Sequence, residues 1–328
     1  MNAPIVIPET DYKRYCQLEN KSWKTLTSLM DRRFPPVKWC VPDFLPEGLT
    51  LLVARPKIGK SWLMLDVALA VSHGRYVLGG ENLCDVGDVL YLALEDNDRR
   101  LQSRIQKLMQ SQPIDGQRLC YQTEWPHVDE GCADRIRDWA TTVTEPRLVV
   151  IDTLQRIRPI KEKDGYKADY EALKSLHKLA SDLRISIVVV HHTRKQDGGE
   201  AVDAISGTLG LAGCADAHMV IKRDGQGTTL FSEGRDIPGG EHAMEFNKIT
   251  CRWRLMGDAS DVRRSNERKV IIDALRDNFE PMTPTDIATD INIKVNNVKQ
   301  LLRKMVKDGE VLKVERGKYT LPERIVNQ

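Results

Sequence analysis

Short apolar runs alternate with amphipathic stretches over the first half of the chain. The runs at 49–55, 86–94, 147–151 and 185–191 are rich in Leu, Val and Ile, as expected of strands buried on both faces of a parallel sheet. Helical spacing follows three of them, at 60–72, 99–109 and 169–183. This alternation predicts an α/β fold with a doubly wound, mostly parallel sheet.

The pattern changes in the last third of the chain. Short strand candidates at 218–223, 227–235, 242–247 and 250–255 are separated by glycines, which indicates an antiparallel edge of the same sheet. Helical stretches at 266–278, 283–291 and 295–308 then precede a hairpin at 311–321, the order of a winged helix-turn-helix. We therefore expect an N-terminal arm (1–40), an α/β domain (41–256), a linker (257–264) and a winged-helix domain (265–328).

A phosphate-binding loop is predicted between the first apolar run and the first helix. The segment A-R-P-K-I-G-K-S, with an alanine in place of the usual first glycine, resembles a P-loop. Backbone N–H groups would bind the β-phosphate, Lys60 would reach the β- and γ-phosphates, and Ser61 would bind Mg²⁺. The alternative is a helix start that binds no nucleotide. The nucleotide-binding residues would be Ala54, Arg55, Pro56, Lys57, Ile58, Gly59, Lys60, Ser61 and Trp62.

Polar residues stand at the carboxyl ends of three further predicted strands. Asp152 is the candidate Mg²⁺ ligand, and Glu95 is the candidate base for the attacking water, with Asp96 as an alternative that only caps the next helix. His191 and His192 end another strand, where a histidine could contact the γ-phosphate or serve only as a structural hydrogen bonder. Because parallel strands end at one edge of a sheet, these groups should share a crevice.

This ordered set of motifs resembles the RecA-like ATPases. The set comprises the P-loop, E-D at 95–96, the strand-end aspartate, H-H-T at 191–193 and S-G-T-L-G-L-A-G-C-A-D at 206–216. More narrowly, it resembles the RepA-type hexameric replicative helicases of plasmids, phages and mobile elements, over about residues 38–255. The resemblance implies that Lys60 and Ser61 bind phosphate and Mg²⁺ and that Asp152 holds the metal. It also implies that Glu95 activates water and that His192 senses the γ-phosphate.

The same resemblance implies a ring of identical subunits, most simply a hexamer. E-G-R-D at 233–236 falls where DnaB-like helicases carry K-Q-R-N, so Arg235 resembles the arginine finger that enters the neighbouring subunit's site. Glu233 replaces the companion lysine. Arg223 is the alternative finger, and either arginine could instead be an ordinary surface residue.

DNA contacts are expected in two places. The family grips single strands with loops at the centre of its ring, and the segments 156–167 and 194–206 fit that role, with Arg194 and Lys195 as candidate contacts. In the C-terminal domain, a helix with an apolar face and a basic face suits a duplex groove, although winged helices also bind proteins. The candidate duplex contacts are Lys294, Asn297, Lys299, Arg303, Lys304, Arg316 and Lys318.

Composition adds limits to this picture. The 49 Lys and Arg against 47 Asp and Glu give a net charge of +2, but residues 263–328 hold 14 against 10, an excess of +4. The 7 cysteines are scattered without zinc spacing, which predicts reduced thiols. Neither a secretion signal nor a spanning segment is evident, so we expect a cytoplasmic protein with no membrane partner.

Two functions follow from these observations. The favoured one is a Mg²⁺-dependent ATPase that forms a ring, moves on single-stranded DNA and unwinds duplexes. The other is an ATP-switched DNA-binding regulator or recombination mediator without unwinding activity. An ATPase unrelated to nucleic acid fits the C-terminal domain poorly.

Overall fold

The computed structural model describes residues 23–80, 83–110, 116–162, 165–192, 211, 213–315 and 317–324. The chain divides into two compact units, Met1–Lys38 and Trp39–Gln328. In the described part of the first unit, one short helix, α2 (Leu26–Met30), is capped by Thr25, whose hydroxyl accepts the Ser28 N–H at 3.1 Å. Otherwise this part is irregular.

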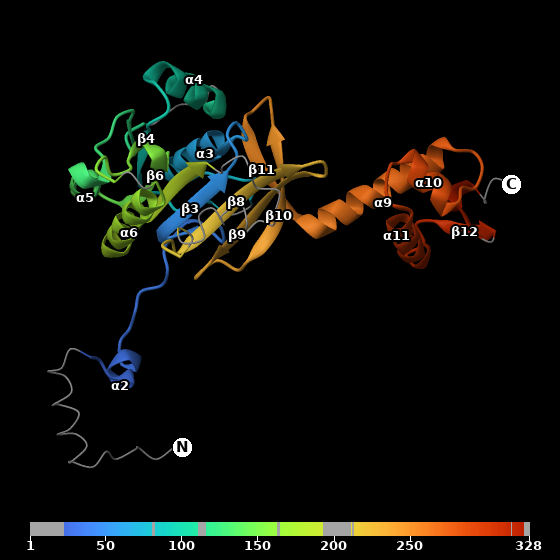
Figure 1. Cartoon of the computed structure of the whole chain (residues 1–328), viewed down its shortest axis with the longest axis horizontal. Helices are drawn as coiled ribbons and strands as arrows, with labels where there is room; N and C mark the ends of the chain where they lie inside the picture. Colours follow the sequence, from blue (N-terminus) through green and yellow to red (C-terminus); the bar gives the residue numbers. More distant parts are fainter. Residues whose placement is uncertain are drawn as a thin grey trace, which may run out of the picture. The chain divides into compact units, whose positions relative to one another are not determined.

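A nine-stranded sheet organises the second unit (Figure 1). The strand order is β11-β10-β9-β8-β3-β7-β6-β4-β5. The strands from β8 to β5 in that order are parallel, whereas β9, β10 and β11 are antiparallel. The bounds are β3 (Gly48–Ala54), β4 (Asp88–Ala93), β5 (Leu119–Gln122), β6 (Pro146–Asp152), β7 (Ser186–His192), β8 (Ala217–Asp224), β9 (Gly227–Gly234), β10 (Gly240–Asn247) and β11 (Arg252–Asp258). The predicted fold class, a mostly parallel sheet with an antiparallel edge, is confirmed.

Helices cover both faces of this sheet. On one face, α3 (Lys60–His73) and α4 (Asp98–Met109) pack against one side of the parallel strands. On the other face lie α5 (Cys132–Thr142) and α6 (Gly165–Leu183). Alternate residues of β3 divide between the two cores, Leu52 with α3 and Leu51 with α6, which explains why the parallel strands are continuous apolar runs.

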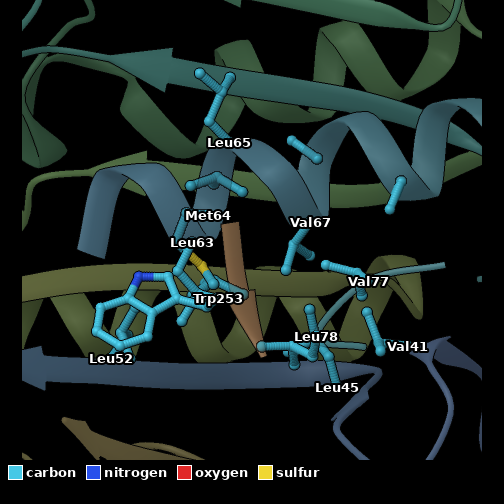
Figure 2. Packing of buried hydrophobic residues seen from close by; sticks show 14 of the residues in the cluster. Val41, Leu45, Leu52, Leu63, Met64, Leu65, Val67, Val77, Leu78 and Trp253 are labelled. Atoms are coloured by element: carbon cyan, nitrogen blue, oxygen red, sulfur yellow. The ribbon is translucent and has the colours of Figure 1, made fainter. Parts of the chain in front are cut away.

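The helix α3 is buried almost all round, because it packs against central strands of the sheet, against the edge strand β11 and against α4. Its contacts include β4, β6 and β11. Figure 2 shows the packing, with Trp253 of β11 in the same cluster as Leu63 and Met64 of α3. A short antiparallel pair, β1 (Trp39–Val41) and β2 (Leu45–Pro46), adds Val41 and Leu45 to this cluster.

Neither β5 nor α5 was predicted from the sequence. The residues of β5 are partly or fully exposed, since this is an edge strand, and they form no apolar run. The helix α5 was missed, although its buried residues, Cys132, Ile136 and Trp139, have the i, i+4, i+7 spacing of an amphipathic helix. Both elements depend on contacts with distant parts of the chain.

The C-terminal module, residues 259–324, contains three helices and a hairpin. The elements are α9 (Ala259–Asp277), α10 (Pro284–Asp290), α11 (Val295–Lys307), β12 (Leu312–Glu315) and β13 (Lys318–Thr320). A separate apolar cluster, which includes Ile271, Ile287, Val298 and Leu302, forms its core. No helix within the described residues combines the length and apolarity that a membrane crossing needs.

The predicted linker at 257–264 is instead regular structure. The strand β11 continues to Asp258, and α9 begins at the next residue. The Asp258 carboxylate caps α9 by accepting the N–H groups of Ser260, at 2.8 Å, and Asp261, at 3.2 Å. The segment resembled a loop because its glycine and polar residues lie on exposed positions of a strand end and a first helical turn.

Candidate nucleotide site

The predicted site residues meet at one edge of the sheet. The strands β3, β7, β6 and β4 are neighbours and parallel. Ala54, which begins the phosphate loop, is the register partner of His192, and Asp152 is the partner of Ala93, two residues before Glu95. The structure therefore brings together the phosphate loop, His192, Asp152 and Glu95, as the strand-end pattern predicts.

The phosphate loop turns sharply between β3 and α3. Two residues adopt the left-handed backbone region, Lys57 with φ 63° and Gly59 with φ 109°. Gly59 is the N-cap of α3, and no side chain caps that helix. Its first N–H groups are therefore available for an anion. Ala54 is buried, whereas Arg55, Pro56 and Lys57 are exposed at the mouth of the loop.

Lys60 is held by groups of its own subunit. Its ammonium donates to the carbonyl oxygens of Ala54, at 2.6 Å, and Arg55, at 3.0 Å, and lies 2.9 Å from Nδ1 of His192. Because an ammonium can only donate, Nδ1 accepts and the imidazole proton belongs on Nε2. Burial lowers the pKa of Lys60 to about 8, against the opposing effect of the Asp152 and Glu95 charges.

Asp152 is a buried residue of the site, with 6% of its surface exposed. Burial raises the pKa of its carboxyl group, while a hydrogen bond with the Ser61 side chain and the charge of Lys60 act in the other direction. The hydroxyl of Tyr91 is 3.5 Å from Asp152 Oδ2 and 3.4 Å from the Ser61 carbonyl oxygen. A buried carboxylate beside a hydroxyl and a phosphate loop is a donor set that suits Mg²⁺.

The described residues contain no cluster of three or more His, Cys, Asp or Glu side chains that could hold a metal ion. Mg²⁺ commonly takes one or two protein carboxylates and completes its shell with phosphate oxygens and water. Ser61 and Asp152 would be the protein ligands.

Glu95 extends toward the open side of the site. Its side chain is 40% exposed, accepts a hydrogen bond from Thr153 Oγ1 at 3.0 Å and lies 3.5 Å from His192 Nε2. Asp96 is not a helix cap, contrary to the alternative that the sequence left open. Asn97 caps α4 by accepting the Arg100 N–H at 3.0 Å.

The Asp96 carboxylate instead forms ion pairs with two arginines of α4. It lies 2.6 Å from Arg100 and 2.9 Å from Arg104. The guanidinium of Arg104 also lies over the Trp62 ring, 5.3 Å from its centroid. These contacts link the start of α3 to α4 beside the nucleotide site.

The two histidines occupy different environments, as adjacent strand residues must. His192 faces Lys60 and Glu95. Burial lowers the pKa of His191 to about 4, with the charges of Asp169 and Arg158 as the next largest influences. His191 thus faces the α6 side of the sheet, and of the two only His192 joins the network of the candidate site.

A family comparison agrees with this geometry. The family model described as an AAA domain matches residues 16–198, more than half of the chain. The chain belongs to the AAA domain family. No curated protein matches the sequence significantly. An AAA domain implies nucleotide binding and ATPase activity, and its match spans the elements from β3 to β7 that carry the phosphate loop, Glu95, Asp152 and His192.

The two arginine-finger candidates lie at opposite ends of the strands of the nine-stranded sheet. Arg223 is near the end of β8, on the phosphate-loop edge, where its Nε donates to Thr228 Oγ1 at 3.1 Å. Arg235 follows β9, at the end of the strands that lies opposite the phosphate loop. Its side chain is 68% exposed and pairs at 3.0 Å with Asp216, whose carboxylate also accepts the Leu49 N–H at the start of β3.

The predicted DNA contacts are only partly described. Arg194, Lys195 and Arg316 lie outside the described residues. The predicted loop at 156–167 is partly pinned, because Arg158 pairs with the buried Asp169 (Nη2 to Oδ2, 2.6 Å) and α6 already begins at residue 165. In the C-terminal module, Lys318 pairs with Glu315 at 3.2 Å. The remaining candidates are all exposed: Lys294, Asn297, Lys299, Arg303 and Lys304.

Sequence reasoning missed three residues that support the site, namely Tyr91, Thr153 and Arg104. Tyr91 could have been found, because a hydroxyl within an apolar run requires a buried partner. Thr153 directly follows Asp152, but nothing in its position predicted a contact with Glu95. Arg104 was one of several cations on an amphipathic helix, and only packing distinguishes it.

Proposed function

We propose that this protein is an ATP-driven DNA motor that assembles as a ring and unwinds duplex DNA, most simply a replicative helicase of a plasmid, phage or mobile element. The observation that carries the proposal is the convergence of Lys60, Asp152, Glu95 and His192 in an AAA domain that continues into a module with an exposed basic helix. The resemblance of the ordered motifs to RepA-type helicases supports the more specific assignment.

In the proposed reaction, Glu95 accepts a proton from the water that attacks the γ-phosphorus. The bond between that phosphorus and the β,γ-bridging oxygen breaks, and ADP and phosphate leave. Lys60 offsets the charge on the phosphate oxygens. Mg²⁺, held by Ser61 and Asp152, would polarise the phosphate when bound. Thr153 orients Glu95 through its hydroxyl group.

His192 fits the role of γ-phosphate sensor. Lys60 has to leave the carbonyl groups of Ala54 and Arg55 to reach a nucleotide, and it then also leaves Nδ1 of His192. The other ring nitrogen of His192 faces Glu95 at 3.5 Å. Binding of the nucleotide phosphates would thereby affect Glu95, the proposed base, through the imidazole ring of His192.

Assembly into a ring would bring the arginine finger of one subunit to the nucleotide site of its neighbour. Arg235 lies at the far edge of the sheet from its own phosphate loop, so it could act only on a neighbouring subunit's nucleotide. Exposure of its side chain is compatible with that role. Arg223 remains the alternative because it lies at the nucleotide edge and is also exposed.

DNA would be bound by two parts of the chain. Arg194 and Lys195 follow β7 in the sequence after one intervening residue, Thr193, and are the proposed contacts to single-stranded DNA. The basic residues of α11 are the proposed contacts to duplex, with their charges displacing counterions from the phosphates.

A second candidate is an ATP-switched DNA-binding regulator or recombination mediator. The separate core of the C-terminal module favours it, because such a module could bind duplex without any translocation by the AAA domain.

Strand displacement from a forked DNA duplex distinguishes the two candidates. The full chain with ATP and Mg²⁺ should release the labelled strand, and the Lys60→Ala variant, matched in every other respect, should not. ATP hydrolysis and duplex binding without any strand release would contradict the helicase proposal and favour the regulator.

A further inference from the structure

Trp253 connects the last strand of the sheet to the phosphate loop. It is 2% exposed, and its indole Nε1–H donates to the carbonyl oxygen of Gly59 at 3.1 Å. Figure 2 shows the indole in the cluster of side chains that α3 buries. Trp253 lies in β11, beyond the residues 16–198 that the AAA domain model matches.

The ring also occupies the space beside Gly59. A Cβ atom at this position would lie 3.1 Å from the indole, and the φ of 109° is one that residues with a side chain rarely adopt. Both observations explain why the residue before Lys60 is a glycine. The loop conformation and the indole are therefore fitted to each other.

The hydrogen bond orients a specific peptide group. The Gly59 carbonyl accepts from the Leu63 N–H within α3, at 3.1 Å, as well as from Trp253. The peptide bond is planar, so the Lys60 N–H points in the opposite direction from that carbonyl. This N–H belongs to the first turn of α3, whose donors have no partner within the helix. By fixing the Gly59 carbonyl, Trp253 thus orients the Lys60 N–H toward the phosphate.

The strand that carries the indole is itself well fixed. The Leu255 N–H donates to the Leu78 carbonyl at 2.9 Å, which joins β11 to the segment after α3. Arg252 donates to the Leu108 carbonyl at 2.6 Å and lies 3.3 Å from the Asp66 carboxylate of α3. The Phe246 ring packs against Trp253 at 5.0 Å between centroids. These contacts leave the indole little freedom to move away from the loop.

We propose that Trp253 is a positioning residue for nucleotide binding: its indole N–H holds the Gly59–Lys60 peptide in the orientation that receives the β-phosphate. The inference rests on the proposed nucleotide binding at this loop and does not depend on DNA unwinding. It assigns part of the phosphate site to β11, the strand that leads directly into α9.

The test is the Trp253→Phe variant of the full chain, which keeps an aromatic ring but loses the N–H donor. Affinity for ATP should fall about two- to ten-fold, the usual effect of one lost hydrogen bond. The KM for ATP should rise in proportion, while kcat changes little, because Glu95 and Asp152 are untouched. Titration with ATP, steady-state kinetics and thermal unfolding give the three measurements.

Trp139→Phe is the matched control. Trp139 is 8% exposed in the other core of the sheet, and its buried indole nitrogen has no hydrogen-bond partner among the described residues. This variant should bind ATP like the unmodified chain. Equal losses of affinity in both variants, or an unchanged affinity in folded Trp253→Phe, would overturn the role of Trp253. Failure of the unmodified chain to bind ATP would instead count against the proposed function.

A second measurement covers the case in which Trp253→Phe does not fold. In the unmodified chain, saturating ATP should shift the Trp253 indole N–H resonance and leave that of Trp139 in place. The signals can be assigned from Trp→Phe variants at the other five of the 6 tryptophans. A Trp253 resonance that ATP leaves unchanged would overturn the proposal.

Discussion

At the scale of single residues, the candidate site depends on two carboxylates in different surroundings. Asp152 is buried beside Ser61 and Tyr91, whereas Glu95 is partly exposed and held by Thr153. A buried acid near a hydroxyl suits a metal, and an accessible acid suits proton transfer to and from water. The difference in burial therefore separates their proposed roles more clearly than sequence position does.

This division predicts different defects for the two amide variants. Glu95→Gln should retain ATP affinity and lose hydrolysis, because an amide cannot accept the proton from water. Asp152→Asn should also weaken Mg²⁺-dependent ATP binding, by about ten-fold, since a metal ligand loses its charge. ATP titrations with and without Mg²⁺, alongside phosphate release, measure both. Identical behaviour of the two variants would contradict the assignment.

Asp66 predicts a pH dependence of stability. Burial raises the pKa of its carboxyl group from 3.8 to about 6, despite the charges of Arg252 and Arg75. The folded chain therefore binds this proton more tightly than the unfolded chain does. Its contribution to the free energy of unfolding is fully present below about pH 4 and is lost as pH rises through about 6, a change of about 2 to 3 kcal/mol.

Asp66→Asn should remove this dependence. Denaturant unfolding of the full chain and of the variant at several pH values between about 4 and 7 gives the comparison, because all other titrating groups are shared. The difference in the free energy of unfolding between the two proteins should change with pH over this range. A constant difference would show that Asp66 does not titrate as described.

At the scale of elements, helix termini show how local sequence becomes structure. Thr283 and Asp286 form a complete capping box at the start of α10, with the Thr283 hydroxyl accepting the Asp286 N–H at 3.2 Å. The Asp286 carboxylate accepts the Thr283 N–H at 3.1 Å in return. Proline at the first helical position adds a further start signal.

Loss of this cap should destabilise the C-terminal module. Thr283→Ala is expected to lower the free energy of unfolding by about 1 kcal/mol, since it leaves the Asp286 N–H without its acceptor. Thr289→Ala is the control on the same helix, because the Thr289 hydroxyl only donates to the Thr285 carbonyl and should contribute little. Unfolding of the module can be followed by circular dichroism. Equal effects of the two variants would show that the box does not stabilise the helix.

At the scale of the whole molecule, Arg235 is the residue that would make ATP hydrolysis depend on the proposed ring assembly. Its ion pair with Asp216 is largely exposed on the arginine side, so its removal should cost little stability. If the arginine acts on a neighbouring subunit, its loss should leave ATP binding intact and reduce turnover by about 10³ or more.

Mixing two inactive variants tests this action between subunits. Arg235→Ala supplies an intact phosphate loop, and Lys60→Ala supplies an intact arginine, so mixed assemblies should regain ATP hydrolysis that neither variant has alone. Arg223→Ala in place of Arg235→Ala is the matched comparison. If mixed assemblies form but recover no activity, Arg235 does not act between subunits.

The sequence by itself determined the parallel strands, the helices after them and the groups at their ends. Continuous apolar runs specify strands buried on both faces, and parallel strands deliver their carboxyl ends to one edge of a sheet. Lys60, Glu95, Asp152 and His192 could therefore be expected together before any contact was known. The helices of the C-terminal module follow in the same way from helical spacing, although the first of them begins within the expected linker.

Only the tertiary structure decided which neighbours complete the site. Thr153 orients Glu95, Tyr91 lies against Asp152, and Trp253 reaches Gly59 from 194 residues away. The tertiary structure also showed that Arg223 and Arg235 lie at opposite ends of the strands and that α9 begins within the expected linker. Periodicity reports which face of an element is buried, but not what buries it. Trp253, for example, reaches Gly59 only because β11, the edge strand of the sheet, packs against α3.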